Sequence, residues 1–159
     1  MSRTRKLNFL LDTCILGMLC HPKHEENRAV VDWIQACINR KTVAIRLILP
    51  EIADYELRRK LLHIALKNKV ATTQSLERLD LFGEDLDYLP LTTSVMKRAA
   101  ELWAESRSKG RPGGKDEALD GDVILAAQAL EVDGVVITTN TRHFKGIVEA
   151  QDLDAPLPS

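Results

Sequence analysis

The sequence predicts an α/β fold in which a central, mostly parallel sheet is covered by helices on both faces. Short apolar segments alternate along the chain with longer segments whose apolar residues recur at helical spacing. The 159 residues, 1–159, suit a single domain, and no stretch has the composition of an inter-domain linker. There is also no internal repeat, heptad array or low-complexity segment that would favour another architecture.

The first third of the chain contains two predicted strands with a helix between them. Lys6–Leu11 is short and apolar, as in a buried strand, and it ends at Asp12. Glu25–Arg40 carries apolar residues at helical spacing and predicts a helix. Thr42–Leu49 alternates and is rich in β-branched residues, which predicts the second strand.

Two helices are expected next. Pro50 suits the first position of a helix over Ile52–Leu66, because its fixed φ matches a helix and its missing N–H is not needed there. Another helix is predicted from Thr73, or the threonine before it, to Phe82, with Gly83 as its stop.

A short strand and a further helix follow. Tyr88–Leu91 predicts the strand, and Thr92, or the threonine after it, is suited to cap the helix. That helix has an apolar face formed by Met96, Ala99, Ala100 and Trp103. Gly110–Gly114 is irregular and predicts a flexible loop before an acidic run.

The last predicted helix and strand bring further polar residues to the sheet. Asp122–Leu130 is rich in alanine and predicts a helix, which Asp122 begins and Gly134 breaks. Val135–Thr138 is a β-branched strand that leads to Asn140 at its end.

Three acidic residues are therefore expected at one edge of the sheet. Ligands of open parallel sheets bind off the carboxyl ends of the strands, where Asp12, Glu56 and Asp122 are predicted to lie. Carboxylates gathered there repel one another and lose hydration, so they need a cation or protons. Oxygen ligands without thiolate or imidazole partners favour Mg²⁺ or Mn²⁺, and such an ion can activate a water against a phosphodiester. The pattern predicts metal-dependent phosphodiester hydrolysis.

Four blocks in this order resemble the motifs of PIN domains, and most closely those of VapC-type toxins of bacterial toxin–antitoxin pairs. The blocks are Leu10–Thr13, Glu56–Leu57, Asp122–Ala129 and Val136–Phe144. The resemblance covers nearly the whole chain, from about Lys6 to Leu153. It implies a PIN-like three-layer α/β/α fold with a central mostly parallel sheet.

The resemblance also implies a function and partners. It assigns Asp12, Glu56 and Asp122 to the metal-binding positions and places the hydroxyl of Thr13 beside them. It implies a Mg²⁺- or Mn²⁺-dependent endoribonuclease that cuts single-stranded RNA. A homodimer and a small inhibitory antitoxin protein are expected with it. The antitoxin would bind near the helices over about Glu25–Arg40 and Ile52–Leu66, a pair that is expected to present an apolar groove, and would direct a basic side chain toward the carboxylates.

One departure from the family pattern concerns a fourth acid. Many relatives carry it at the position of Asn140 or of His143, neither of which is acidic here. Asn140 offers a carbonyl oxygen without charge and is kept as a predicted site residue. The sequence leaves open whether the mechanism uses one metal ion or two. Asp120 is a candidate substitute for the missing acid.

Each site residue also has an ordinary structural interpretation. Asp12 suits a turn or helix cap, Glu56 an i,i+4 pair with Lys60, and Asp122 a helix N-cap. Glu51, at a helix start, is the best rival to Glu56. Asp54 is a weaker rival, and Asp116 and Glu117 are expected in a solvated acidic loop. Basic residues that could contact substrate phosphates are Arg58, Arg59, Lys60, Arg142 and Lys145, although a solvated helix face is favoured for most of the first three.

The cysteines and histidines near the amino terminus do not match a zinc pattern. Three cysteines without a C-x-x-C pair make neither a disulfide framework nor a thiolate metal site. Cys14, Cys20, His21 and His24 are instead assigned to a surface loop. Cys37 falls on the apolar stripe of its helix and is assigned to the core.

Charge and hydropathy exclude other classes of protein. A net charge of −1 argues against a protein that coats nucleic acid through a large basic surface. No apolar run approaches the roughly 20 residues that span a bilayer, and Leu7–Leu11 is too short for a signal peptide, so no membrane partner and a cytoplasmic location are expected. Two alternatives remain beside the toxin. One is a catalytically weak PIN-like module that binds RNA or a partner protein, and the other is a housekeeping RNA-processing nuclease.

Overall fold

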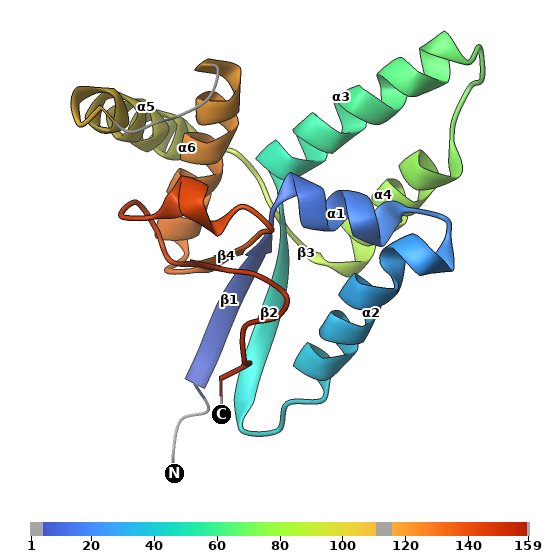
Figure 1. The fold of residues 1–159 in the computed structure, drawn as a ribbon, viewed down its shortest axis with the longest axis horizontal. Coiled ribbons are helices and arrows are strands. Elements are labelled where there is room, and N and C mark those ends of the chain that lie inside the picture. Colours follow the sequence, from blue (N-terminus) through green and yellow to red (C-terminus); the bar gives the residue numbers. More distant parts are fainter. Residues whose placement is uncertain (1–4, 111–115, 159) are drawn as a thin grey trace.

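Parallel strands form the centre of the molecule (Figure 1). The computed structural model describes residues 5–110 and 116–158, and the strands within these ranges form one five-stranded parallel sheet in the order β3-β2-β1-β4-β5. They are β1 (Arg5–Leu11), β2 (Val43–Pro50), β3 (Asp87–Leu89), β4 (Val135–Ile137) and β5 (Ala150–Gln151). The α/β class with a parallel sheet is thereby confirmed.

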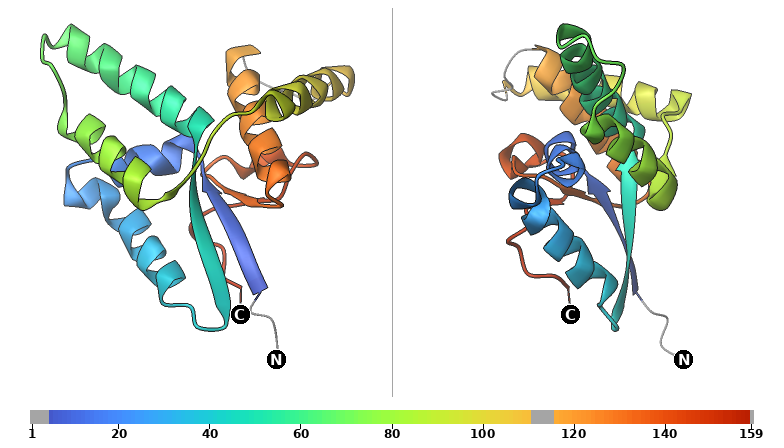
Figure 2. Two further views of the ribbon diagram at one scale, coloured as in Figure 1. Left: turned by 180° about the vertical axis from the view of Figure 1, so that it is seen from behind. Right: turned by 90° about the vertical axis from the view of Figure 1, so that its right-hand side faces the viewer.

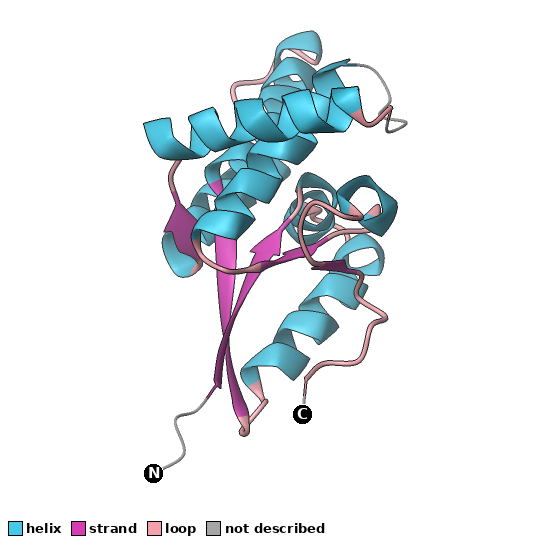
Figure 3. Ribbon diagram, turned by 90° about the vertical axis from the view of Figure 1, so that its left-hand side faces the viewer, coloured by secondary structure: helices cyan, strands magenta, loops and turns pink. Residues whose placement is uncertain are grey.

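Helices cover both faces of this sheet. They are α1 (Thr13–Cys20), α2 (His24–Ile38), α3 (Glu51–Lys67), α4 (Gln74–Asp85), α5 (Thr93–Ser108), α6 (Asp116–Glu131) and the 3₁₀ helix η1 (Thr141–Phe144). Because side chains alternate along a strand, Phe9 and Leu11 pack in the core with α1 and α2, whereas Leu10 packs with α5 and α6. Figures 2 and 3 show these helices on the two sides of the strands, and the result is the expected three-layer α/β/α architecture.

The register of the sheet brings the ends of β1 and β4 side by side. Leu11 pairs with Ile137, and the next residues along the two strands are Asp12 and Thr138. The backbone N–H of Asp12 donates to the carbonyl of Ile137 at 2.9 Å. Both residues therefore leave the sheet together at its carboxyl edge, where ligand sites of parallel sheets lie.

Most of the predicted strands and helices are present close to their predicted positions. The structure also decides between neighbouring threonines at two helix starts. Thr73 caps α4, because its hydroxyl accepts a hydrogen bond from the backbone N–H of Leu76 at 3.2 Å. Thr92 caps α5 in the same way, with the N–H of Val95 at 3.1 Å.

Two predicted helix boundaries are wrong. Pro50 is the last residue of β2 and the N-cap of α3, because pairing with Leu89 in β3 holds it in the extended conformation. Gly83 does not stop its helix, which continues to Asp85. Burial of Leu79 in the core holds α4 in place, and a glycine inside a helix costs only about 1 kcal/mol.

The acidic segment before Asp122 also differs from its prediction. Helix α6 begins six residues before Asp122, which therefore neither begins nor caps the helix. The acids expected in a loop belong to α6 instead: Asp116, Glu117 and Asp120. Burial of Leu119 together with Val123 extends the apolar face of α6 in the N-terminal direction and accounts for the earlier start. Nearly all of the predicted loop Gly110–Gly114 lies outside the described residues.

Besides the 3₁₀ helix η1, two elements have no counterpart among the predictions. One is α1, whose buried residues Ile15, Leu16 and Leu19 make it part of the core, so Cys14 and Cys20 lie in a helix and not in a surface loop. The other is β5, a short edge strand beside β4. No helix in the part of the chain that the structure describes is both long and apolar enough to cross a membrane.

Candidate active site

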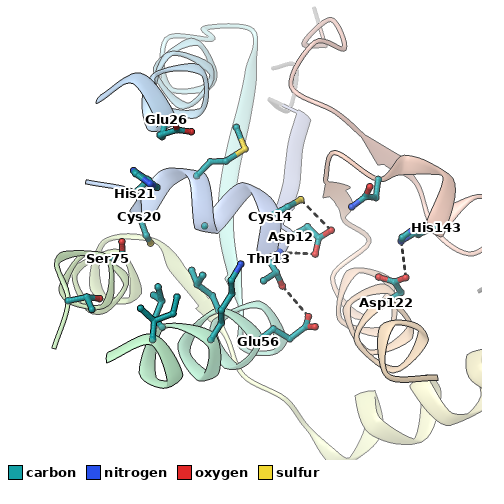
Figure 4. Close-up of a pocket in the computed structure, with 18 residues that line it drawn as sticks. Asp12, Thr13, Cys14, Cys20, His21, Glu26, Glu56, Ser75, Asp122 and His143 are labelled. Atoms are coloured by element: carbon teal, nitrogen blue, oxygen red, sulfur yellow. Dashed lines mark hydrogen bonds and ion pairs between the residues drawn. The ribbon is translucent and has the colours of Figure 1, made fainter. Parts of the chain in front are cut away.

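A groove of about 730 Å³ opens at the carboxyl edge of the sheet, and all the predicted site residues line it (Figure 4). Asp12 comes from the end of β1, Glu56 from α3 and Asp122 from α6. Asn140 and His143 reach the same groove from the segment after β4. Residues far apart in the sequence are therefore brought together as the sequence predicted.

Asp12 is fixed by both of its carboxylate oxygens. It caps α1, since its Oδ1 accepts the backbone N–H of Thr13 at 2.7 Å. Its Oδ2 accepts the hydroxyl of Thr138 at 2.6 Å. The N-terminus of a helix also stabilises a negative charge placed there. Asp12 is therefore a helix cap, as its ordinary structural interpretation expected. It also lines the groove.

Glu56 is held against the amino end of α1. Its Oε1 accepts the hydroxyl of Thr13 at 3.0 Å, and its Oε2 lies 3.8 Å from the guanidinium of Arg59 rather than beside Lys60. Burial raises the pKa of Glu56; the bond from Thr13 and the charge of Arg59 oppose this rise, while the charge of Asp12 adds to it. Glu56 is thus a partly buried carboxylate on which the negative charge of Asp12 also acts.

Asp122 is the most perturbed carboxyl of the groove. Burial raises the pKa of Asp122, His143 opposes the rise, and the charges of Asp12 and Glu56 add to it, which together give a pKa of about 6. The Nδ1 atom of His143 lies 3.2 Å from its Oδ2. The charge of Asp12 thus acts on both Glu56 and Asp122, and the charge of Glu56 acts on Asp122.

The donor chemistry of this site fits a hard cation. Partly buried carboxylates such as Glu56 and Asp122 are stabilised by a nearby positive charge, and oxygen donors favour Mg²⁺ or Mn²⁺. Among the described residues, however, no three Asp, Glu, His or Cys side chains are grouped as direct ligands of one ion. Mg²⁺ commonly binds through one or two carboxylates and keeps several waters, so it does not require three side chains grouped as direct ligands. The donor types of the described residues thus fit a hard cation, but these residues do not form a closed protein cage.

The rival carboxylates are engaged elsewhere. Glu51 accepts the backbone N–H of Leu91 at 3.1 Å and so ties the start of α3 to the chain after β3. Asp54 accepts bonds from Arg58 at 2.9 Å and from the hydroxyl of Tyr88 at 2.8 Å. Asp120 is exposed and lines a different hollow, between α5 and α6. Of the acidic site candidates that the sequence offered, Asp12, Glu56 and Asp122 line the groove, whereas Glu51, Asp54 and Asp120 do not.

The roles of two site residues were not foreseen from the sequence, although the family pattern had already singled out the position of His143. Thr138 is buried and links Asp12 to the chain near Asn140, whose backbone N–H donates to the Thr138 hydroxyl at 3.0 Å. A hydroxyl directly after a β-branched strand, beside the strand of Asp12, was a usable signal for it. His143 contacts Asp122 only because η1 turns the chain back over α6, which no local pattern in the sequence reveals.

Beyond the carboxylates, the groove has an apolar arm between α1 and α3. Its floor is formed by Gly17, Met18, Leu57, Leu61 and Ile64. Lys60 also lines it, and the far end is closed by residues of α4 and its N-cap. The prediction placed an apolar groove between the helices now labelled α2 and α3. The structure corrects this, because α1 lies between them and α2 contributes only Glu26 among the described lining residues.

Comparison with known proteins agrees with this architecture. The PIN domain family model matches residues 9–149, and no curated protein matches the chain. One similar solved structure is VapBC2 from Rickettsia felis bound to a DNA fragment from their promoter, with 18% identity, coverage of 92% of this chain and 98% of that one, and a TM-score of 0.69. Another is VapBC-1 from nontypeable Haemophilus influenzae, with 22% identity, 94% and 100% coverage, and a TM-score of 0.68.

A third similar structure is FitAcB from Neisseria gonorrhoeae, with 24% identity, 91% and 97% coverage, and a TM-score of 0.63. At these identities the structural likenesses establish the fold, and the family assignment rests on the sequence model. That model spans most of the chain, including every carboxylate of the groove. The chain belongs to the PIN domain family.

Proposed function

We propose that this protein is a metal-dependent endoribonuclease that hydrolyses phosphodiester bonds of single-stranded RNA, with Mg²⁺ or Mn²⁺ held by Asp12, Glu56 and Asp122. The observation that carries the proposal is the meeting of these three carboxylates, from three separate elements, in one groove. The raised pKa of Glu56 and of Asp122 supports binding of a cation nearby. PIN domains are generally nucleases, which agrees with this chemistry.

The protein's own groups would prepare the site for substrate. Thr13 and Thr138 orient the carboxylates of Glu56 and Asp12 by direct hydrogen bonds. His143 does the same for Asp122. Lys60 lies in the groove as a cation for an RNA phosphate. The bound ion supplies activation of a water and polarisation of the phosphodiester. With Asn140 uncharged at the groove, we favour one strongly held ion over two.

The test is an RNA cleavage assay paired with metal titration. Purified protein should cut single-stranded RNA in Mn²⁺ or Mg²⁺ and stop when a chelator is added. Asp122→Asn should abolish cutting with the fold intact, whereas Asp120→Asn is the matched control, because that carboxylate lies on the same helix but outside the groove. Full activity in Asp122→Asn, or equal losses in both variants, would contradict the assignment.

We further propose that a small antitoxin protein occupies the apolar arm of the groove and directs a basic side chain toward the carboxylates. The arm joins an apolar floor to a negatively charged end, which suits a helix with both kinds of side chain. One similar structure is titled a toxin–antitoxin complex from Klebsiella pneumoniae. Expression of this protein alone should then arrest growth, and expression with its antitoxin should not.

A matched pair of variants tests where the antitoxin binds. Leu61 lines the arm, whereas its neighbour Leu62 is 43% exposed and is not among the lining residues. Leu61→Gln should weaken binding of the antitoxin while Leu62→Gln leaves it unchanged. The same loss in both variants would place the partner elsewhere on α3.

A second candidate function rests on Asn140 and His143. Neither residue adds a negative charge to the groove, which favours a catalytically weak PIN-like module that binds RNA or a partner protein. Absence of cutting together with metal-independent RNA binding would support that function. Harmless overexpression of a protein that cuts RNA would instead indicate a housekeeping RNA-processing nuclease. The homodimer and the cytoplasmic location stay predictions of the sequence.

A further inference from the structure

Gly121 lies directly before Asp122 in α6, and its backbone faces the carboxylate of Glu56. A Cβ atom added at Gly121 would lie 2.8 Å from Oε2, 3.0 Å from Oε1 and 3.1 Å from Cδ of Glu56. Contacts shorter than about 3.0 Å are essentially never made by a real Cβ atom. The carboxylate of Glu56 therefore occupies the space that any side chain at position 121 would need.

The backbone conformation does not explain why a glycine stands here. Among the described glycines, Gly110 and Gly146 have positive φ, whereas Gly121 lies inside a regular helix. Alanine is the better helix former at such a position. The atoms that an added methyl group would meet all belong to the end of the flexible Glu56 side chain. The fold thus has no need of glycine at this position, whereas the site does.

Glu56 is confined from two directions. On one side the Thr13 hydroxyl donates to its Oε1 at 3.0 Å, and on the other it rests against Gly121. We propose that Gly121 is a positioning residue, whose missing side chain lets the Glu56 carboxylate lie against α6 beside Asp122. This deepens the proposed function, because only there can both acids serve the same ion. Displacement of a carboxylate from a metal site typically costs metal affinity at least tenfold, as loss of a supporting contact does.

The experiment compares two glycine-to-alanine variants. Gly121→Ala should lower the Mn²⁺ affinity measured by isothermal titration by about tenfold or more, while the metal-free protein melts at the same temperature or higher. Gly83→Ala is the matched control, since Gly83 also lies inside a helix but an added Cβ meets nothing within 4 Å. It should leave Mn²⁺ affinity unchanged. Wild-type affinity in Gly121→Ala, or an equal loss in Gly83→Ala, would overturn the proposal.

A shorter acid supplies a rescue that a purely structural role would not show. Glu56→Asp draws the carboxylate back by one methylene and so makes room for a methyl group at position 121. Gly121→Ala in the Glu56→Asp background should therefore cost less Mn²⁺ affinity than it costs in the wild type. Equal costs in the two backgrounds would mean that the two residues act independently, which contradicts the proposal.

Melting temperatures of metal-free variants test the contact between Gly121 and Glu56 independently of the proposed function. If the wild type binds no Mn²⁺, the proposed function fails, and the contact itself is then tested in the metal-free protein. Gly121→Ala should raise the melting temperature more in a Glu56→Ala background, where no carboxylate is displaced, than in the wild type. Equal shifts in the two backgrounds would refute the contact, and with it the positioning role.

Discussion

Helix α3 carries two acid clusters that differ in what balances their charge. In the first, Asp54 and Asp80 both bind Arg58, at 2.9 Å and 2.8 Å, and the hydroxyl of Tyr88 adds a further bond to Asp54. Burial would lower the pKa of Arg58, but its bonds to the two aspartates outweigh burial and raise it. This cluster contains its own cation and fastens α3 to α4 and β3.

The second cluster begins only two residues further along α3 and lacks such a cation. Glu56 has Arg59 at 3.8 Å, and Asp122 has the imidazole of His143, yet the pKa of both acids remains raised. The comparison teaches that acid content alone does not identify a metal site. What marks a candidate metal site is a set of partly buried carboxylates whose charge the protein leaves uncompensated.

The largest difference between the clusters should appear in catalysis. Asp12→Asn removes a charge from the uncompensated cluster and should lower the rate of RNA cleavage by more than about a hundredfold, since loss of one electrostatic contributor commonly costs that much. Asp54→Asn changes an acid of the compensated cluster and should leave the rate nearly unchanged. Initial rates at saturating Mn²⁺ measure both. Comparable rates for the two variants would remove the functional distinction between the clusters.

The metal-free protein should lose stability as the pH rises. The folded-state pKa of Asp122 is raised to about 6, so its contribution is fully present below the ordinary pKa of an aspartate and is lost as the pH rises through about 6. The full shift would correspond to about 3 kcal/mol, and the exposed part of the side chain reduces this to roughly 2 kcal/mol. Urea unfolding in chelator at several pH values measures it. Asp122→Asn should flatten the pH dependence of the free energy of unfolding. A wild-type profile as flat as that of the variant would contradict the raised pKa of Asp122.

In the compensated cluster, removal of an acid should destabilise the fold. Asp54→Asn weakens the bonds to Arg58 and Tyr88, and we expect a loss of about 1–2 kcal/mol in the free energy of unfolding. Asp122→Asn should have the opposite sign in the metal-free protein at neutral pH, because it relieves repulsion. Urea unfolding of the two variants side by side gives both signs. A loss of stability in both would show that the second cluster is also held by internal pairing.

The last variant tests the uncharged position at the groove. Asn140→Asp adds a negative charge to the uncompensated cluster, and an opposite charge a few ångströms away from an ion is worth about 1–4 kcal/mol at intermediate dielectric. Mn²⁺ affinity should therefore rise several-fold in isothermal titration at fixed ionic strength. The cleavage rate is a poorer readout, since tighter binding of the ground state does not guarantee a better transition state. No gain in affinity would place Asn140 outside the metal site.

Patterns that repeat along the chain made much of the fold predictable. The apolar strand before Asp12 and the β-branched strand over Val135–Ile137 were sufficient to place their ends at one edge of the sheet. The family motifs then selected the three carboxylates from among many acids. Element boundaries were less predictable, because burial of Leu79 and Leu119 overrides what the local glycines and acids indicate.

The rest of the site depends on contacts between distant segments. The bond from Thr13 to Glu56 and the approach of Gly121 to the same carboxylate exist only once α1, α3 and α6 have packed together. Helix α1 itself was missed because its short apolar sequence lacks a polar face. His143 reaches Asp122 through the turn of η1, which is a tertiary feature and leaves no periodic signal in the sequence.

We propose that the carboxylates of Asp12, Glu56 and Asp122 bind a cation that the protein itself does not supply. The most direct test is a titration of the Asp122 side-chain carboxyl carbon by NMR, with and without Mg²⁺, which is diamagnetic. In chelator the pKa of Asp122 should be about 6, and saturating Mg²⁺ should lower it below the ordinary value for an aspartate. A pKa that is already low in chelator, or that Mg²⁺ leaves unchanged, would contradict the account.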